Sequence, residues 1–248
     1  MRKILSIVLV VVFTMHSCNV NDEIKDVQLK IPFVNGVPYS FEKVTDPVIW
    51  SSYTSLKEMQ DACQIPENWL KQMSTKNLVE TCMNYPLYGL YMAYNNEMDG
   101  LEVLINGFNG FEELKNRSDA AEELLAYYEG LSVVNTKSGE IELGEMVKPL
   151  HLGYVELVLA SDVIPQLYDD MNYKRLEKMS QGILQLKIQR PEDFSIQTIS
   201  KSLLLAAKVK LQKYQINPSD SELLRNFIEA GGMASDPDIY TKVSKIVK

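Results

Sequence analysis

Beyond its first residues the chain contains one histidine, and this limits the chemistry available to it. His16 lies near the start, and His151 lies in the most apolar stretch of the sequence. A zinc site with two histidines is therefore excluded beyond the first residues. A Ser-His-Asp triad would have to use His151, but no Gly-x-Ser-x-Gly turn accompanies it, and glycine-rich phosphate loops are absent. We expect His151 to pack inside the fold or to cap a helix, and we assign no catalytic residue, metal ligand or cofactor.

Carboxylates are abundant between residues 112 and 123, where they occupy Glu112, Glu113, Asp119, Glu122 and Glu123. A glycosidase needs two such groups facing each other across a cleft. These acids instead fall in the first turns of predicted helices, where negative charge complements the helix dipole. We interpret them as caps and a solvated face, and keep a carboxylate-dependent hydrolase as an alternative.

Four tyrosines recur at every third position, at Tyr85, Tyr88, Tyr91 and Tyr94. A tyrosine offers a ring face together with a hydroxyl, which suits sugars and partner surfaces, so these residues form a candidate binding ridge. At about 100° per residue, however, a regular helix turns Tyr94 about 180° away from Tyr85. We therefore expect at least one end of the row to pack inward.

Two cysteines, Cys63 and Cys82, lie in the body of the chain without a Cys-x-x-Cys spacing. Both fall on apolar faces of predicted helices, where a free thiol behaves as a small buried hydrophobe. An oxidising compartment would also permit a bond between them. They are a candidate disulfide, and the spacing excludes a redox motif or a zinc site.

The elements that position these residues are mainly helical from about residue 54 onward. Ser55 with Glu58 has the spacing of a capping box, and Asp236 before Pro237 suits a helix start. Residues 147–164 are apolar on all sides, which indicates a surrounded central helix. Apolar stripes at steps of three and four follow at Leu176, Met179, Ile183 and Leu186, and at Ile196, Ile199, Leu203, Ala207, Leu211 and Tyr214.

The predicted fold is mainly α, as an irregular multi-helix bundle or as stacked helix pairs. No fixed-period repeat supports a true solenoid. Two small β-hairpins are predicted. One lies near residues 28–41, where Asn35-Gly36 separates two apolar runs, and the other lies near residues 132–143.

The N-terminus has the layout of a bacterial lipoprotein signal. Arg2 and Lys3 precede a short apolar run, and Ser17 precedes Cys18. The run is too short to cross a bilayer, which takes about 20 residues. We predict a signal peptide over residues 1–17, lipid attachment at Cys18, a tether and extended N-terminal segment over residues 18–45, and a single helical domain over residues 46–248.

Removing the signal changes the charge of the chain. The full sequence carries 25 cations and 33 anions, so cleavage before Cys18 leaves 23 cations and a net charge of −10. An acidic domain is repelled by nucleic acid backbones and anionic lipid heads. We therefore expect no nucleic acid partner, and contact with a membrane through the N-terminal lipid.

A resemblance supports this interpretation. The stretch Ile65-Pro66-Glu67-Asn68-Trp69 runs through Met73-Ser74-Thr75 to Tyr85-Pro86, and Phe108-Asn109-Gly110-Phe111 and Arg117-Ser118-Asp119 follow. Over roughly residues 45–130 the chain resembles a group of uncharacterised Bacteroidetes lipoproteins. The resemblance implies an envelope lipoprotein and supplies no activity. Asp22-Glu23 also resembles the surface-export signal of such lipoproteins, and the membrane face stays open.

The leading functional hypothesis is an outer-membrane lipoprotein without catalytic activity. Its helical body would contact another envelope protein. The alternatives are a glycan-binding accessory lipoprotein that uses the four tyrosines, and the hydrolase named above.

Overall fold

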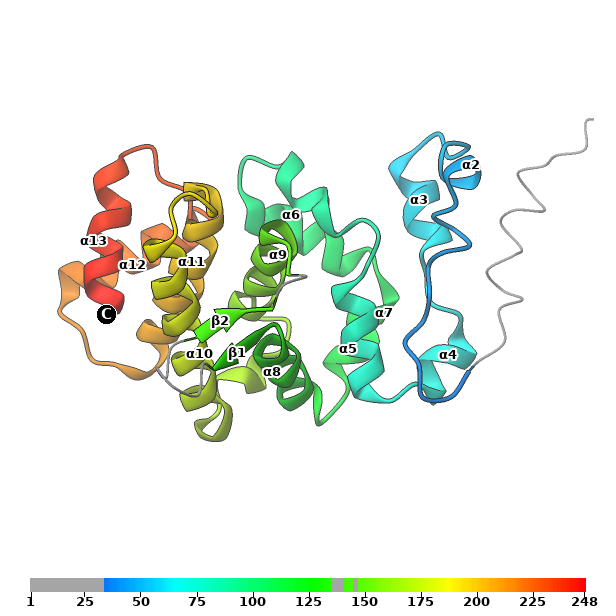
Figure 1. Ribbon diagram of the computed structural model, residues 1–248, viewed down its shortest axis with the longest axis horizontal. Helices are drawn as coiled ribbons and strands as arrows, with labels where there is room; N and C mark the ends of the chain where they lie inside the picture. The colour runs from blue at the N-terminus through cyan, green and yellow to red at the C-terminus, as the bar shows by residue number, and fades with distance from the viewer. Residues whose placement is uncertain (1–33, 135–140, 145–146) are drawn as a thin grey trace, which may run out of the picture.

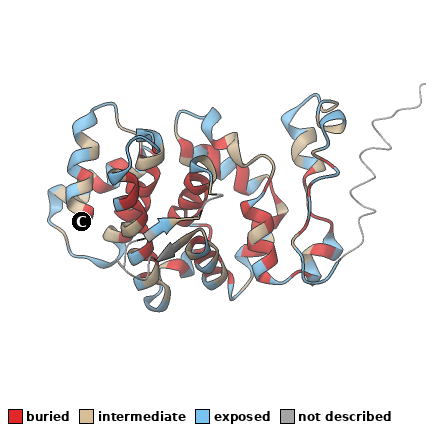
Figure 2. Cartoon of the chain, viewed as in Figure 1, coloured by how far each residue is buried: buried red, intermediate tan, exposed pale blue. Residues whose placement is uncertain are grey.

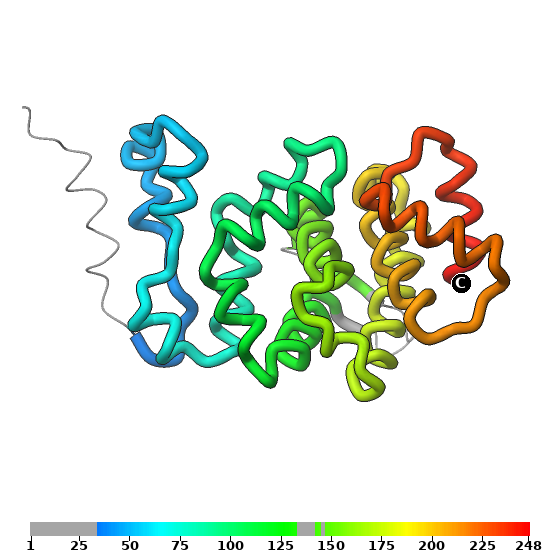
Figure 3. The backbone as a smooth tube through the Cα atoms, turned by 180° about the vertical axis from the view of Figure 1, so that it is seen from behind, coloured from blue at the N-terminus to red at the C-terminus, as the bar shows by residue number. Residues whose placement is uncertain are grey.

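The helices of this protein form an elongated row (Figure 1). The computed structural model describes residues 34–134, 141–144 and 147–248. The first described residues lie at one end of the row and the C-terminal helix lies at the other, as the view from behind also shows (Figure 3). The predicted mainly α fold is confirmed.

The first half of the row is built from short helices. Their bounds are α2 (Pro47–Trp50), α3 (Leu56–Ala62), α4 (Glu67–Gln72), α5 (Thr75–Met83), the 3-10 helix η2 (Tyr88–Ala93), α6 (Glu97–Asn106), α7 (Asn109–Lys115) and α8 (Ala120–Gly130). The predicted start at Ser55 is confirmed, because its side chain accepts a hydrogen bond from the Glu58 N–H.

The second half contains the longer helices. Their bounds are α9 (Pro149–Ala160), the 3-10 helix η3 (Pro165–Tyr168), α10 (Asp170–Gln189), α11 (Ile196–Lys213), α12 (Pro218–Glu229) and α13 (Pro237–Val247). Asp236 caps α13 as predicted, by accepting a hydrogen bond from the Asp238 N–H. The prediction of a surrounded helix is also confirmed, because α9 is buried without interruption from Leu152 to Ala160.

The core runs along the row on the facing sides of its helices (Figure 2). The helix α9 packs against α11, and α11 packs against both α10 and α13. The predicted stripe on α10 lies in this core, since Leu176, Met179, Ile183 and Leu186 are all buried. The stripe on α11 is wrong at both ends, because Ile196 and Tyr214 are exposed while Leu203 and Ala207 are buried.

One of the two predicted hairpins is confirmed. Strands β1 (Ser132–Val134) and β2 (Ile141–Leu143) pair antiparallel, with Ser132 opposite Leu143. They lie beside α8 and α10.

The other hairpin prediction is wrong where it can be checked. Residues 28–33 lie outside the described residues, and residues 34–41 contain a turn but no strand. The backbone N–H of Tyr39 binds the Thr81 hydroxyl at 3.0 Å, so a helix takes the place of a partner strand. Tyr39, Phe41 and Val44 are buried in the core, so the packed body begins before residue 46, within the predicted tether and extended N-terminal segment.

No helix among the described residues has the length and apolar composition required to cross a membrane.

Candidate functional site

The predicted lipid site and its signal lie outside the described part of the chain. Cys18 belongs to residues 1–33, which the structure does not describe. Lipid attachment there stays a prediction, and the described residues have to be considered for other functions.

The predicted tyrosine ridge does not form a surface. Tyr85 and Tyr91 are 1% and 0% exposed, Tyr88 is half-buried, and Tyr94 alone is exposed, at 36%. The ridge prediction is wrong, and the expectation that one end packs inward is confirmed. That expectation assumed a regular α-helix, whereas residues 88–93 form a 3-10 helix. With about three residues per turn, side chains three positions apart share one face.

That shared face of η2 points toward α9 rather than toward solvent. The Tyr91 ring stacks on Tyr154 with centroids 6.4 Å apart, and the Tyr88 ring tilts against Tyr154 at 5.5 Å. The Tyr154 hydroxyl donates to the Cys82 carbonyl at 3.1 Å. The periodic tyrosines therefore join three elements of the core.

The candidate disulfide between Cys63 and Cys82 is absent, and both thiols are free and buried. Cys63 caps the end of α3, and Cys82 lies inside α5 next to Gly110 of α7. Each sulfur fills space in an apolar core, as a small hydrophobe does. Burial raises the pKa of Cys63 to about 12 and also raises the pKa of Cys82, so neither thiol is a nucleophile in the folded chain.

His151 has a structural role in the described fold. Its Nε2 donates to the Met83 carbonyl at 3.0 Å, which satisfies the end of α5. Its ring meets the edges of Tyr88 and Tyr127. Burial lowers the pKa of His151, so the neutral imidazole is favoured. The expectation of a packed or capping histidine is confirmed.

Two of the carboxylates of residues 112–123 contact other polar side chains. Glu113 pairs with Arg117 at 2.7 Å, and Asp119 accepts a hydrogen bond from the Thr75 hydroxyl at 2.7 Å. Arg117 also donates to the Leu70 carbonyl, at the end of α4. Glu112 lies in the first turn of α7, and Glu122 and Glu123 lie in the first turn of α8, as predicted. The predicted cap is wrong for Asp119, whose side chain makes no cap hydrogen bond to α8.

A buried ionic cluster, which no sequence pattern indicated, lies between α8, α9, α10 and α11. Glu156 and Lys187 pair at 2.6 Å, and both side chains are 0% exposed. Glu156 also accepts hydrogen bonds from Ser202 at 2.6 Å and Tyr128 at 3.3 Å. Lys187 donates in addition to the Thr198 carbonyl at 3.0 Å. Burial lowers the pKa of Lys187, and the adjacent Glu156 carboxylate opposes that change.

A second ion pair lies nearby. Lys201 and Glu97 pair at 2.7 Å, with side chains 4% and 10% exposed. Lys201 also donates to the Gln197 carbonyl at 3.0 Å and lies 5.6 Å from the centre of the Tyr91 ring. This pair joins α6 to α11.

Both pairs are structural. A general acid or base must reach its substrate, either directly or through one water. Glu156 and Lys187 are fully buried, and neither lines a cavity described below. The hydrolase alternative therefore gains no support from them and stays a prediction. Among the described residues, no group of three or more His, Cys, Asp or Glu side chains could hold a metal ion.

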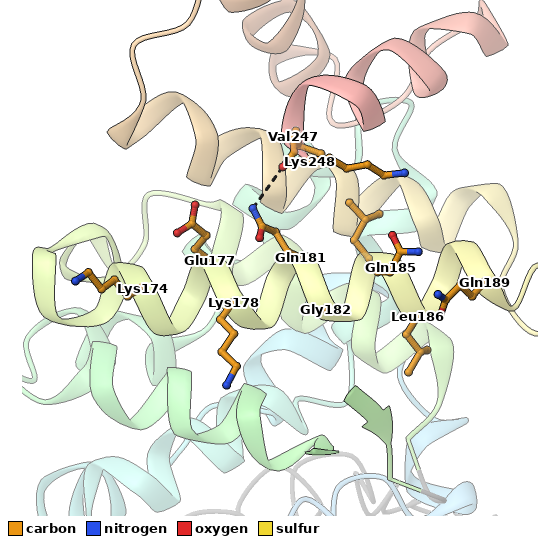
Figure 4. Close-up of a pocket in the computed structure, with 11 residues that line it drawn as sticks. Lys174, Glu177, Lys178, Gln181, Gly182, Gln185, Leu186, Gln189, Val247 and Lys248 are labelled. Carbon is orange, nitrogen blue, oxygen red and sulfur yellow. Dashed lines mark hydrogen bonds between the residues drawn. The ribbon is translucent and has the colours of Figure 1, made fainter. Parts of the chain in front are cut away.

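The surface of α10 offers a more accessible site. A cavity of about 580 Å³ extends along this helix to the end of α13 (Figure 4). We call it the α10 groove. It is lined by Lys174, Glu177, Lys178, Gln181, Gly182, Leu184, Gln185, Leu186, Gln189, Val247 and Lys248.

The chemistry of the α10 groove differs from that of the whole chain. Lys174, Lys178 and Lys248 are exposed and form no ion pair among the described residues. Glu177, the one acidic side chain of the lining, accepts hydrogen bonds from Tyr214 at 2.7 Å and Tyr173 at 3.3 Å. The groove is therefore cationic on a chain with a net charge of −8.

Amides accompany the lysines. Gln181 donates to the Val247 carbonyl at 3.4 Å, which joins α10 to the end of α13 (Figure 4). Gln185 and Gln189 are exposed. Amide groups both donate and accept hydrogen bonds, as peptide groups do. The signal for this face was present in the sequence, since residues 174, 178, 181, 185 and 189 follow steps of four and three. The predicted stripe follows the apolar face of the same helix and shares only Leu186 with the groove.

Comparison with models of protein families, with curated proteins and with solved structures gave no match.

Proposed function

We propose that this protein is a lipid-anchored envelope protein whose helical body is a non-catalytic interaction module. It binds an acidic, extended segment of another envelope protein in the α10 groove. The observation that carries this proposal is a cationic, amide-rich groove on an otherwise acidic chain.

Charge selects the partner. An acidic segment is attracted by Lys174, Lys178 and Lys248 and repelled by most of the remaining surface, so it can settle in one place. The lysines are available because no carboxylate among the described residues pairs with them. A basic partner would be repelled by these lysines and attracted by the acidic remainder of the surface, so it would not bind at α10.

Shape supports an extended partner. The lining of α10 runs from Lys174 to Gln189, which at 1.5 Å per residue is roughly 22 Å of helix. An extended segment of roughly seven residues covers that length. The exposed amides of Gln185 and Gln189 can bind its backbone, while the lysines bind its acidic side chains.

The lipid anchor is tested first and separately. Cells grown on labelled palmitate should yield a labelled protein that lacks its first seventeen residues, because the mature chain would begin at a lipidated Cys18. The Cys18→Ala variant should remain unlabelled. An unlabelled wild-type chain with its leader attached would remove the anchor from the proposal and leave the groove untouched.

The groove is tested by site-directed photocrosslinking in intact cells. A photoreactive residue at Gln185 should capture one protein through an acidic segment identified by mass spectrometry. The same residue at Glu222, which is exposed on α12, should not capture it. The Lys174→Glu/Lys178→Glu variant should reduce capture at Gln185 at least tenfold, since two attractions become repulsions.

The matched control is the Lys76→Glu/Lys148→Glu variant, which changes charge equally at two exposed lysines outside the groove. It should capture as the wild type does. Equal losses in both double variants would show a general charge effect, and a captured segment without acidic residues would contradict the proposal.

A further inference from the structure

A second cavity lies in the first half of the row. Its volume is about 600 Å³, which is within the usual range of small-ligand sites of roughly 300–1,000 Å³. We call it the Trp50 cavity. It is lined by Pro38, Tyr39, Ser40, Phe41, Glu42, Thr45, Trp50, Glu80, Thr81, Asn84 and Pro86.

The apolar part of the lining is aromatic and firmly held. Tyr39 and Phe41 are buried, and their rings meet edge to face with centroids 5.1 Å apart. The Tyr39 N–H binds the Thr81 hydroxyl, and the Thr45 hydroxyl binds the Phe41 carbonyl at 3.0 Å. The first hydrogen bond fixes the segment to α5, and the second holds the turn of the segment itself.

Trp50 contributes a half-buried indole to the same cavity. Its ring contacts Tyr53 edge to face, with centroids 5.8 Å apart and planes at 90°. The indole also packs against the core, and part of its residue surface lines the cavity. A ring held in this way can pack against the apolar face of a ligand at little cost in side-chain entropy.

The polar part of the lining consists mainly of hydrogen-bond acceptors. Neither the Glu42 nor the Glu80 carboxylate has a hydrogen bond or ion pair among the described residues. The Asn84 amide donates to the Glu80 main-chain carbonyl at 2.9 Å, which leaves its oxygen as an acceptor. No lysine, arginine or histidine is among the described residues that line the cavity.

This combination defines the ligand. Two carboxylates repel an anion and bind a group with several hydrogen-bond donors. The aromatic lining requires the same ligand to present an apolar face. A pyranose has both properties, with hydroxyl donors around its edge and C–H groups on its faces. We propose that the Trp50 cavity binds a non-acidic saccharide, stacked on Trp50 and held by Glu42, Glu80 and Asn84.

This site is distinct from the α10 groove, since the two linings share no residue. It also differs from the tyrosine ridge that the sequence suggested. None of the four ridge tyrosines lines the cavity.

The test begins with the mature lipidated protein in detergent on an array of neutral, amino and acidic saccharides. A neutral or amino saccharide should bind, and titration calorimetry should then give its affinity. Trp50→Ala should weaken binding at least tenfold. Glu80→Gln should do the same without changing the shape of the cavity, because it replaces a charged acceptor.

Two controls keep the result interpretable. Glu222→Gln removes an equivalent exposed charge on α12 and should bind as the wild type does. The Lys174→Glu/Lys178→Glu variant should also leave saccharide binding unchanged, so failure here and failure of the proposed function can be told apart. Thermal unfolding of each variant checks that it is folded.

Three results would overturn the inference. They are the absence of binding to every neutral and amino saccharide, a preference for acidic saccharides or for lysine-rich peptides, and binding that Glu80→Gln and Trp50→Ala leave unchanged.

Discussion

From Tyr39 to Gly130, neighbouring helices are joined mainly by aromatic rings and by side chains that bind helix ends, whereas from Pro149 to Val247 long helices enclose ionic groups. In the first half, Asn109 binds both backbone groups of Ile65, and Gln64 donates to the Gly107 carbonyl at 2.9 Å. In the second half, Glu156 and Lys187 form a fully buried pair.

Helix length explains the difference. Every helix leaves about four N–H and four C=O groups without partners inside it. The helices before residue 131 are 4 to 11 residues long, so the unpaired groups at helix ends make up much of their backbone. Nearby polar side chains form hydrogen bonds with these groups. The 20 residues of α10 and 18 residues of α11 are mostly interior, so their polar side chains are available for a buried cluster and for an exposed groove.

The largest effect should come from breaking the buried pair. Lys187→Met leaves Glu156 charged and without its cation, which should cost about 3–5 kcal/mol of unfolding free energy. The Glu156→Leu/Lys187→Met double variant should recover most of that loss, because no unpaired charge remains. Urea denaturation measures both. A double variant no more stable than the single one would contradict this account of the second half.

An intermediate effect is expected in the first half. Asn109→Ala removes the side chain that binds the Ile65 N–H at 2.9 Å and its carbonyl at 2.8 Å. Two backbone groups of a buried residue then lack partners, which should cost about 1–3 kcal/mol. Asn106→Ala, at an exposed position near the end of α6, should change stability by less than about 0.5 kcal/mol. Equal losses of unfolding free energy in the two variants would show that the hydrogen bonds of Asn109 do not stabilise this half.

The smallest effect concerns His151, which links the two halves through the Met83 carbonyl. Its pKa is lower in the folded chain than its ordinary value of 6.5, so the unfolded chain binds the proton more readily. The free energy of unfolding should therefore fall as the pH drops through 6.5 toward the folded-state pKa. No other histidine remains after the signal is removed, so His151→Gln should abolish this slope in denaturation measured at about pH 7.5 and about pH 5.5. If the His151→Gln variant kept the same dependence of unfolding free energy on pH, that dependence would come from other titratable groups.

Much of the fold could be predicted from residue periodicity. The uninterrupted apolar run of α9 and the stripe of α10 identified buried surfaces, because a helix places residues at steps of three and four on one side. The stripe on α11 failed at its two ends, because Ile196 is the first residue of the helix and Tyr214 follows its last residue, and both are exposed. The middle of the helix is surrounded, so its polar residues Ser202 and Lys201 are buried as well. Periodicity carries no information once both faces pack.

The candidate sites were harder to predict for a related reason. The tyrosine ridge assumed the α-helical period, but the 3-10 turn of η2 changes which side chains align. The buried pair joins residues 31 positions apart, and the Trp50 cavity joins segments that are also distant in the sequence. Neither separation leaves a local pattern. The α10 groove did leave one, in the polar steps from Lys174 to Gln189.

The end-to-end arrangement of the helices has a mechanical consequence. The first described residues and α13 lie at opposite ends of the row, and along it α9 packs against α11, which packs against α13. Tension applied between the two ends would pass through these interfaces in series rather than being shared among them. The weakest interface would then set the force at which the molecule extends, and extension would proceed in separate steps.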